Sequence, residues 1–151
     1  MIILRYEKGL NPKYQTVYSA GADLMAAENT VIKAGQKAKV RTGVWIEKTE
    51  EDKIPSGCIP ELQIRARSGL AYKHGITLTN AVGTVDADYR DEICVLLWNT
   101  GESDFTINRG DRIAQLILNL VQRLDQLEVG GQRVGGFGST NIIKEESATI
   151  N

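Results

Sequence analysis

The segment KVRTGVWI, residues 39–46, decides the fold class of this 151-residue chain. Its residues Val40, Thr42, Val44 and Ile46 alternate with the other four. Successive side chains of a strand point to opposite faces, so a period of two predicts a β-strand with one buried face. An amphipathic helix would repeat its apolar residues with a period of 3.6, and no stretch of helical length in this sequence does so.

Similar patterns recur along the chain. Residues 61–66 alternate in the same way, residues 93–98 are apolar throughout, and residues 113–118 carry apolar side chains on both faces. The second of these predicts a strand that is buried on both faces. Glycine-containing turn signals separate the strands, at residues 33–35, 99–101 and 108–110. Short strands at this density predict an all-β fold, a distorted jelly-roll β-barrel or sandwich.

Three segments depart from the strand pattern. Residues 68–73 predict one short helix with Ser68 as its N-cap, and residues 48–57 predict an exposed polar loop. Five of the nine residues from Gly130 to Gly138 are glycine, which leaves this segment little to bury. We therefore expect a single domain, with a catalytic core at 1–128 and a flexible glycine-rich C-terminal arm at 129–151.

Charge and composition limit the function classes. The net charge of −1 argues against general affinity for nucleic acid or for anionic membranes. No apolar run approaches the ~20 residues that cross a membrane, and the first residues lack a secretory or transit pattern. Cys58 and Cys94 are far apart and predict two reduced thiols in a cytoplasmic protein. With His74 as the only histidine, a typical zinc site is excluded.

Two clusters suggest a site for an anion and a reaction on it. Residues 65–70, RARSGL, place two arginines before the expected helix, where backbone N–H groups and guanidinium donors favour an anion. Residues 83–89, GTVDADY, place Asp86 and Asp88 beside Tyr89, where a carboxylate can act as a general base. Solvated arginines at a strand end and an acidic turn remain the alternatives for each cluster taken alone.

Two further clusters are weaker taken alone. Residues 112–115, RIAQ, supply a cation and an amide on a predicted strand. Residues 135–140, GGFGST, are similar to a phosphate-cradling loop because glycine permits close approach of the backbone to an anion. They do not form a P-loop, since no lysine precedes Ser139. A plain strand and a linker are the respective alternatives.

Taken together and in order, these clusters resemble the trimeric dUTPase family from about Ala20 to Thr140. Five family motifs are matched, at residues 20–24, 65–75, 80–90, 110–116 and 135–140. Ala66 stands where the family usually has proline, and Asn141 replaces a usual glycine. Gln132 occupies the usual position of a tail arginine and Arg133 follows it, so either Arg133 takes over that role or the tail binds phosphate more weakly.

The resemblance implies hydrolysis of dUTP to dUMP and pyrophosphate. Asp86 is then the general base for a water molecule that attacks the α-phosphorus. The resemblance also implies Mg²⁺ as cofactor, held by substrate phosphates and water without a direct protein ligand, and Asp23 is a candidate for contact through that water. A dCTP deaminase of the same fold and a catalytically silent nucleotide-binding trimer are the alternatives; the retention of Asp86 favours the hydrolase.

The resemblance also assigns the binding residues. Phosphate contacts fall to Arg67, Ser68, Gly69 and Gln115. A hairpin over residues 80–89 receives uracil through Asn80, Gly83, Thr84, Val85 and Asp86, and Tyr89 stacks under the deoxyribose. The arm closes over the substrate through five residues, Arg133, Phe137, Gly138, Ser139 and Thr140. The implied assembly is a homotrimer in which three subunits share each site, and His74 is assigned a structural role.

Overall fold

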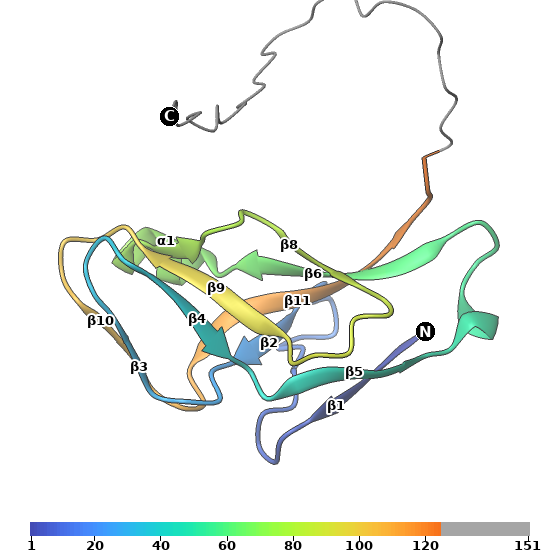
Figure 1. Cartoon of the computed structure of the whole chain (residues 1–151), viewed down its shortest axis with the longest axis horizontal. Helices are drawn as coiled ribbons and strands as arrows, with labels where there is room; N and C mark the ends of the chain where they lie inside the picture. The colour runs from blue at the N-terminus through green and yellow to red at the C-terminus, as the bar shows by residue number, and fades with distance from the viewer. Residues whose placement is uncertain (125–151) are drawn as a thin grey trace, which may run out of the picture.

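The computed structural model describes residues 1–124, which form eleven β-strands, one 3-10 helix and one α-helix (Figure 1). The predicted all-β fold with one short helix is confirmed. None of the helices in this part of the chain is long and apolar enough to cross a membrane. The elements are β1 (Ile2–Tyr6), β2 (Ala22–Met25), β3 (Thr30–Ile32), β4 (Lys37–Arg41), β5 (Val44–Thr49), η1 (Glu51–Lys53), β6 (Ile59–Ala66), α1 (Ser68–His74), β7 (Ile76–Leu78), β8 (Gly83–Asp86), β9 (Cys94–Asn99), β10 (Phe105–Ile107) and β11 (Arg112–Val121).

The strands pair antiparallel in a jelly-roll-like arrangement that joins segments distant in sequence. The largest sheet has the order β2-β11-β6-β8, and a second sheet has the order β4-β9-β7. Two-stranded ribbons, β1-β5 and β10-β3, complete the described strands. The long strand β11 lies between β2 and β6 and pairs with both. The pairing of β11 therefore sets the register of the largest sheet.

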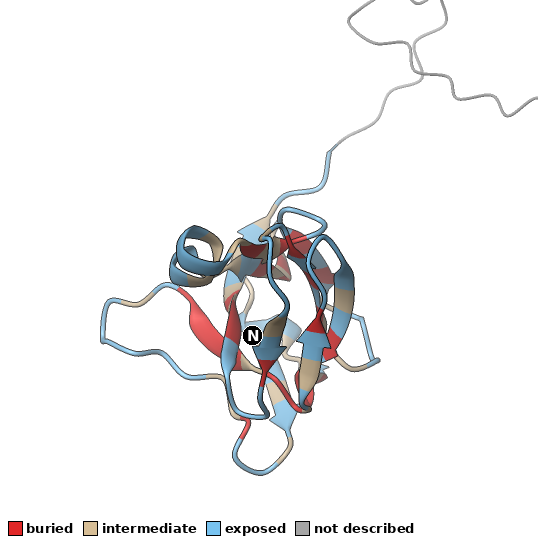
Figure 2. Ribbon diagram, turned by 90° about the vertical axis from the view of Figure 1, so that its left-hand side faces the viewer, coloured by how far each residue is buried: buried red, intermediate tan, exposed pale blue. Residues whose placement is uncertain are grey.

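One hydrophobic core lies between the sheets, as the buried positions in Figure 2 show. Its members come from ten of the described strands, all except β1, and from their connections. They are mostly β-branched residues and leucine, which pack well on a pleated surface. The core cluster consists of Leu24, Ala26, Ile32, Val40, Val44, Ile46, Leu62, Ile64, Ile76, Leu78, Val85, Ile93, Val95, Leu97, Ile107, Ile113, Ala114 and Leu116.

The segment at residues 39–46 is buried as predicted but is not one strand. Val40, Thr42 and Val44 are each fully buried. However, Gly43 has a φ of +65° and turns the chain, so β4 pairs with β9 whereas β5 pairs with β1. An added Cβ at Gly43 would lie 2.9 Å from Leu10 Cδ1, so the turn requires glycine. The alternation thus predicted burial correctly, and glycine allows the chain to change sheets.

Strand β9 corrects a second expectation. Residues 93–98 were expected to be buried on both faces, but Leu96 and Trp98 are each 39% exposed. Val95 and Leu97 are buried on the opposite face. The outer face of β9 lies beside the pocket described below, and Leu96 forms part of its lining. The expected exposed loop at residues 48–57 is also shorter than predicted, because Lys48 and Thr49 belong to β5.

The predicted turns are present, and one of them is anchored by a buried amide. Asn99 is fully buried, and its Nδ2 donates to the carbonyl oxygens of Ile32 at 2.9 Å and Ser103 at 2.8 Å. Its Oδ1 accepts from Gly101 N at 2.9 Å. All of these partners are backbone groups, two of them in the turn and the following loop and one at the end of β3, so Asn99 fixes the turn and ties it to β3. His74 packs against Phe105 with ring centroids 5.1 Å apart, which supports its structural role.

We predict that Asn99→Ala lowers the free energy of unfolding by about 3 kcal/mol, because it leaves three backbone groups without their partner. Equilibrium urea denaturation measures this change. Asn29→Ala is the matched control, since its side chain is exposed and accepts one bond, from Arg109 N at 2.8 Å. We expect a loss of about 1 kcal/mol or less for the control. Equal losses in the two variants would contradict an anchoring role for Asn99.

Candidate active site

One half of the candidate site is built on a buried carboxylate between two arginines. Asp23 lies on β2 and is 2% exposed. Its Oδ2 accepts from Arg112 Nη1 at 3.1 Å, and its Oδ1 lies 3.3 Å from Arg67 Nε. Arg67 Nη1 also donates to the carbonyl oxygen of Arg112 at 3.0 Å. These contacts hold the two guanidinium groups beside each other at the ends of β6 and β11.

The charge of this cluster suits an anion. One buried negative charge offsets only one of the two positive charges. The side chains of Arg67 and Arg112 are 27% and 46% exposed, so both reach solvent while their inner N–H groups contact Asp23. A guanidinium group has five N–H donors in a planar fork, and the donors not used here remain for a ligand. The cluster can therefore bind a phosphate group.

The neighbouring predicted phosphate contacts lie on the same edge. Helix α1 begins at Ser68 with Arg67 as its N-cap, so the prediction of Ser68 as N-cap is wrong by one residue. Ser68 and Gly69 are exposed, and no side chain caps the first turn. Gln115 pairs with Asp23 on β2 and with Arg65 on β6. The ladder thus brings Arg67, Ser68, Gly69 and Gln115 to one region.

The other half of the site is a pocket of about 260 Å³ between β8 and β9. It gathers all six residues that were assigned to the uracil and the sugar, namely Asn80, Gly83, Thr84, Val85, Asp86 and Tyr89. It also includes five residues that the sequence did not indicate, which are Lys39, Ile64, Ile93, Cys94 and Leu96. Those five residues belong to β4, β6 and β9 or directly precede β9. Strand pairing brings them to the pocket, and no local sequence motif indicates that pairing.

The segment over residues 80–89 is not the hydrogen-bonded hairpin that was expected. Strand β8 pairs with β6, whereas the following strand β9 pairs with β4 and β7. Within residues 1–124, no ladder joins β8 to β9. The two strands diverge into different sheets, and their separation opens the pocket. The six residues thus line one pocket, although the local structure differs from the expected hairpin.

The position of the Asn80 amide in the pocket depends on two backbone features. An added Cβ at Gly83 would lie 3.0 Å from Asn80 Nδ2 and 3.3 Å from Ile64 Cβ, so glycine makes room for the amide. Ala81 has a φ of +59°, a left-handed conformation that costs an L-residue roughly 1–2 kcal/mol. Strain of this kind is often found at ligand sites. The tight turn places the Asn80 amide directly beside β8.

A second turn holds Asp86 and Tyr89 at the open end. Tyr89 N donates to the carbonyl oxygen of Asp86 at 3.0 Å, and Arg90 Nη1 donates to the carbonyl oxygen of Ala87 at 3.0 Å. Asp86 is exposed and faces the pocket, as expected of a base that must reach a ligand. Burial, followed by the charge of Asp91, raises the pKa of Tyr89, so its hydroxyl stays protonated near neutral pH.

The two halves of the site lie far apart on one chain. Asp86 pairs with Glu61 on β6, and Arg67 follows six positions later. At about 3.3 Å per residue, the strand separates them by roughly 20 Å. A general base and the groups that bind the reacting phosphate must act within a few ångströms of each other. Within the described residues, therefore, one chain does not bring both halves together.

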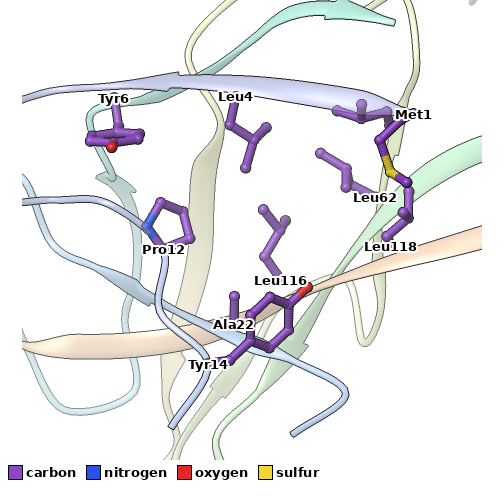
Figure 3. A pocket seen from close by; sticks show the side chains of 10 residues that line it. Met1, Leu4, Tyr6, Pro12, Tyr14, Ala22, Leu62, Leu116 and Leu118 are labelled. Atoms are coloured by element: carbon purple, nitrogen blue, oxygen red, sulfur yellow. The ribbon is translucent and has the colours of Figure 1, made fainter. Parts of the chain in front are cut away.

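The remaining predicted site residues lie outside the described residues. These are the five contacts of the arm, at Arg133, Phe137, Gly138, Ser139 and Thr140. A separate apolar pocket of about 250 Å³ lies under β1 (Figure 3). Its lining includes Leu4, Tyr14, Leu62 and Leu118 and has no ionisable carboxylate or cationic side chain, so it offers no chemistry for the reaction.

The dUTPase family model matches residues 7–141 of this chain. The chain belongs to the dUTPase family. Members of this family from two bacteria share nearly half of its sequence. The deoxyuridine 5'-triphosphate nucleotidohydrolase of Rhizobium meliloti is 47% identical over 93% of this chain and 89% of its own length. The enzyme of the same name from Treponema denticola is 46% identical over 90% of this chain and 94% of its own length.

Solved structures of the family agree with the fold. The dUTPase from Streptococcus mutans is 28% identical, with a TM-score of 0.69, and the match covers 82% of this chain and 98% of that structure. The family and the jelly-roll-like fold expected from the sequence are thus confirmed. The individual roles that the resemblance assigned to the site residues stay predictions.

We predict that Asp23→Asn lowers the free energy of unfolding by about 2–3 kcal/mol, because it removes the charge that faces both arginines inside the protein. The same change should weaken substrate binding, since Arg67 and Arg112 lose their common support. Urea denaturation and the KM for dUTP measure the two effects. Asp104→Asn is the control, because Asp104 pairs with Lys33 at 2.6 Å on the surface.

In the control we expect a change of about 1 kcal/mol or less and no change in KM. If Asp23→Asn changed the free energy of unfolding and the KM no more than Asp104→Asn does, Asp23 would not position the two arginines.

Proposed function

We propose that this chain hydrolyses dUTP to dUMP and pyrophosphate, as a dUTP diphosphatase. The observation that carries the proposal is the pocket between β8 and β9, which gathers the Asn80 amide, the Asp86 carboxylate and the Tyr89 ring. Its volume of about 260 Å³ suits a ligand of nucleoside size. Membership of the dUTPase family and the names of the bacterial relatives support the same reaction. The reaction removes dUTP and supplies dUMP.

Asp86 acts as the general base. Its carboxylate is exposed at the open end of the pocket, and its position is fixed by the turn that Tyr89 N closes. It accepts a proton from a water molecule and orients that water toward the α-phosphorus. The bond from the α-phosphorus to the bridging oxygen breaks, and pyrophosphate leaves as one piece. Phosphoryl transfer depends mainly on positioning and charge neutralisation, which suits a site with a single base.

The pocket selects the base and the sugar by complementarity. The Asn80 amide and the backbone of β8 offer donors and acceptors to the uracil edge. Gly83 leaves room for that amide, and the core residue Ile64 closes the pocket behind it. The Tyr89 ring packs against the deoxyribose. A base or sugar that left these polar groups unpaired would be penalised more strongly than one that lost an apolar contact.

The arginine cluster binds the triphosphate. Arg67 faces the phosphates together with Ser68, Gly69 and Gln115, and Asp23 positions the guanidinium groups. Mg²⁺ is the proposed cofactor, and it neutralises charge on the phosphate oxygens. Residues 1–124 contain no group of three acidic, histidine or cysteine side chains that could hold a metal ion. We propose that substrate phosphates and water would hold the ion. Asp23 Oδ2 accepts from Arg112, whereas the buried Oδ1 lies 3.3 Å from Arg67 Nε and has no hydrogen-bond partner among the described residues. Asp23 therefore positions the arginines, and its Oδ1 is the candidate acceptor for that water.

The complete site is shared between subunits of a homotrimer. The roughly 20 Å between Asp86 and Arg67 within one subunit supports a site that combines the Asp86 pocket of one subunit with the arginine cluster of another. Exposed apolar side chains also favour association, since Tyr14, Val17 and Tyr18 are 60%, 94% and 97% exposed. The arm residues Arg133, Phe137, Gly138, Ser139 and Thr140 then close the site from a third subunit.

A cytoplasmic location completes the proposal. Cys58 and Cys94 are both free, as in a reducing compartment. No nucleic acid or membrane is required as a partner, and dUTP is the ligand.

We predict that Asp86→Asn lowers kcat on the order of 10²-fold or more, because an amide of the same shape cannot accept the proton of water. Pyrophosphate release from dUTP measures the rate, and isothermal titration should show that dUTP binding is largely retained. Asp88→Asn is the control, since this exposed carboxylate lies two residues away and does not line the pocket.

We expect wild-type turnover from Asp88→Asn. More than about a tenth of the wild-type rate in Asp86→Asn would exclude Asp86 as the base. Ammonia release from dCTP, measured in parallel, would indicate a deaminase instead. Nucleotide binding without pyrophosphate release from the wild type would indicate a silent trimer.

We further predict that two inactive variants complement each other. Asp86→Asn damages the pocket half of each site and Arg67→Ala damages the phosphate half. After joint unfolding and refolding in equal amounts, random cyclic assembly leaves about a quarter of the sites with both halves intact. The mixture should therefore recover about a quarter of the wild-type activity per site. Activity no greater than the sum of the separate variants would contradict a site shared between subunits.

A further inference from the structure

Glu92 connects the substrate pocket to the turn between β4 and β5. Its Oε1 accepts a hydrogen bond from Gly43 N at 2.7 Å, and its Oε2 accepts one from Arg41 Nε at 2.8 Å. The Glu92 side chain is only 17% exposed. Both carboxylate oxygens are thus used, and both partners belong to the turn where the chain changes sheets. Bonds of this kind, from a donor to an ionised carboxylate, are stronger than neutral ones.

The same turn also holds the residue that follows Glu92. Ile93 N donates to the carbonyl oxygen of Val44 at 2.8 Å, and Thr42 Oγ1 donates to the carbonyl oxygen of Ile93. Residues 92 and 93 are therefore fixed through side chain and backbone together. This leaves the backbone of Glu92 with a defined position and direction.

The carbonyl oxygen of Glu92 lies beside Tyr89. It accepts a hydrogen bond from Tyr89 Oη at 3.4 Å, a long bond that depends on how well the carbonyl is held. The other end of Tyr89 is held by its N–H, which donates to the carbonyl oxygen of Asp86 at 3.0 Å. The ring, which belongs to the lining of the pocket, therefore lies between these two attachments. Its orientation depends on both attachments.

From these contacts we infer that Glu92 is a positioning residue for the substrate pocket, which fixes the Tyr89 ring by clamping its own backbone to the Arg41–Gly43 turn. The inference rests on the proposed function, because it assigns the selection of substrate to this clamp. Glu92 does not touch the substrate. It acts through Tyr89, whose ring forms part of the pocket wall.

The clamp should affect binding more than chemistry. A ring that packs against the sugar contacts the ground state and the transition state alike, so its misplacement raises KM with little change in kcat. A looser ring should also discriminate less sharply against a sugar with an additional hydroxyl group. A residue that only stabilised the fold would change neither KM nor the discrimination between the two sugars, provided that the enzyme remained folded.

Glu7 offers a matched control. Its Oε1 accepts from the same Arg41, through Nη2 at 3.2 Å, and its Oε2 accepts from Arg109 Nη2 at 3.2 Å. Removing either acid deletes one carboxylate partner of Arg41. Glu7 N also donates to the carbonyl oxygen of Gly43 at 2.8 Å, a backbone bond that Glu7→Ala keeps. Among residues 1–124, however, no hydrogen bond or ion pair joins the Glu7 side chain to residues 89–92. A difference between Glu92 and Glu7 variants therefore isolates the clamp from the ion-pair network.

The experiment compares Glu92→Ala, Glu92→Gln, Glu7→Ala and Tyr89→Phe, with dUTP and UTP as substrates. We expect Glu92→Ala to raise KM for dUTP about tenfold, to change kcat by less than about threefold, and to narrow the preference for dUTP over UTP. Glu92→Gln keeps an acceptor for Gly43 N and should give an intermediate KM. Glu7→Ala should retain the wild-type KM. Glu92→Ala should raise KM less in a Tyr89→Phe background, since both substitutions weaken the contact between the Tyr89 hydroxyl and the Glu92 carbonyl oxygen.

Two results would overturn the inference. One is a KM for Glu92→Ala that equals that of Glu7→Ala, and the other is full additivity of Glu92→Ala with Tyr89→Phe. Thermal unfolding of each variant, together with titration of a non-hydrolysable imido analogue of dUTP, shows whether a raised KM reflects binding by folded protein. Failure of the wild type to hydrolyse dUTP would refute the proposed function instead, so the two failures are distinguishable.

Discussion

The antiparallel pairing of β11 with β6 is the constraint on which both halves of the site depend. The ladder extends from Ala114 opposite Ala66 to Val121 opposite Ile59. At one end it places Gln115 beside Arg65, next to the arginine cluster, and β6 continues toward the edge where β8 carries Asp86. The distance between the phosphate contacts and the base is thus a property of strand register. A loop could adapt to shorten it, but a ladder of this length cannot slip without exposing the core.

The arginine cluster shows why a buried charge is retained at this point of the sheet. Asp23 is removed from water at a cost that two guanidinium groups offset, whereas the ion pair of Lys33 with Asp104 lies in solvent and contributes little. The buried carboxylate restricts the directions in which Arg67 and Arg112 can point. For a phosphate ligand, this restriction means that less side-chain entropy is lost on binding than with two free arginines.

Local patterns in the sequence predicted the turns and the strand character of residues 39–46, 61–66, 93–98 and 113–118, because strand period is a local property. The resemblance to the dUTPase family, which rests on the order of the motifs, supplied the residues of the pocket. Three features depend on how the strands pair, and local sequence patterns could not predict them. The turn at Gly43 divides one alternating segment between two sheets, β9 is buried on one face only, and β8 diverges from β9. For the same reason Lys39 and Cys94 were not recognised as pocket residues, since β4 and β9 meet only through their register.

Selectivity in this pocket depends on backbone geometry as much as on side chains. The Asn80 amide can lie beside β8 because Gly83 has no Cβ, and the turn that delivers it includes Ala81 in a left-handed conformation. At the open end, the carbonyl oxygens of Asp86 and Glu92 hold Tyr89 at its N–H and its hydroxyl. Backbone groups fixed by sheet pairing lose little further freedom when a ligand binds, so they can reject a base that fits poorly without a large penalty for ordering the site. The two walls of the pocket are therefore held separately, β8 by its ladder with β6 and β9 by its ladders with β4 and β7, and the β6–β8 ladder also keeps Asp86 away from the arginines of its own chain.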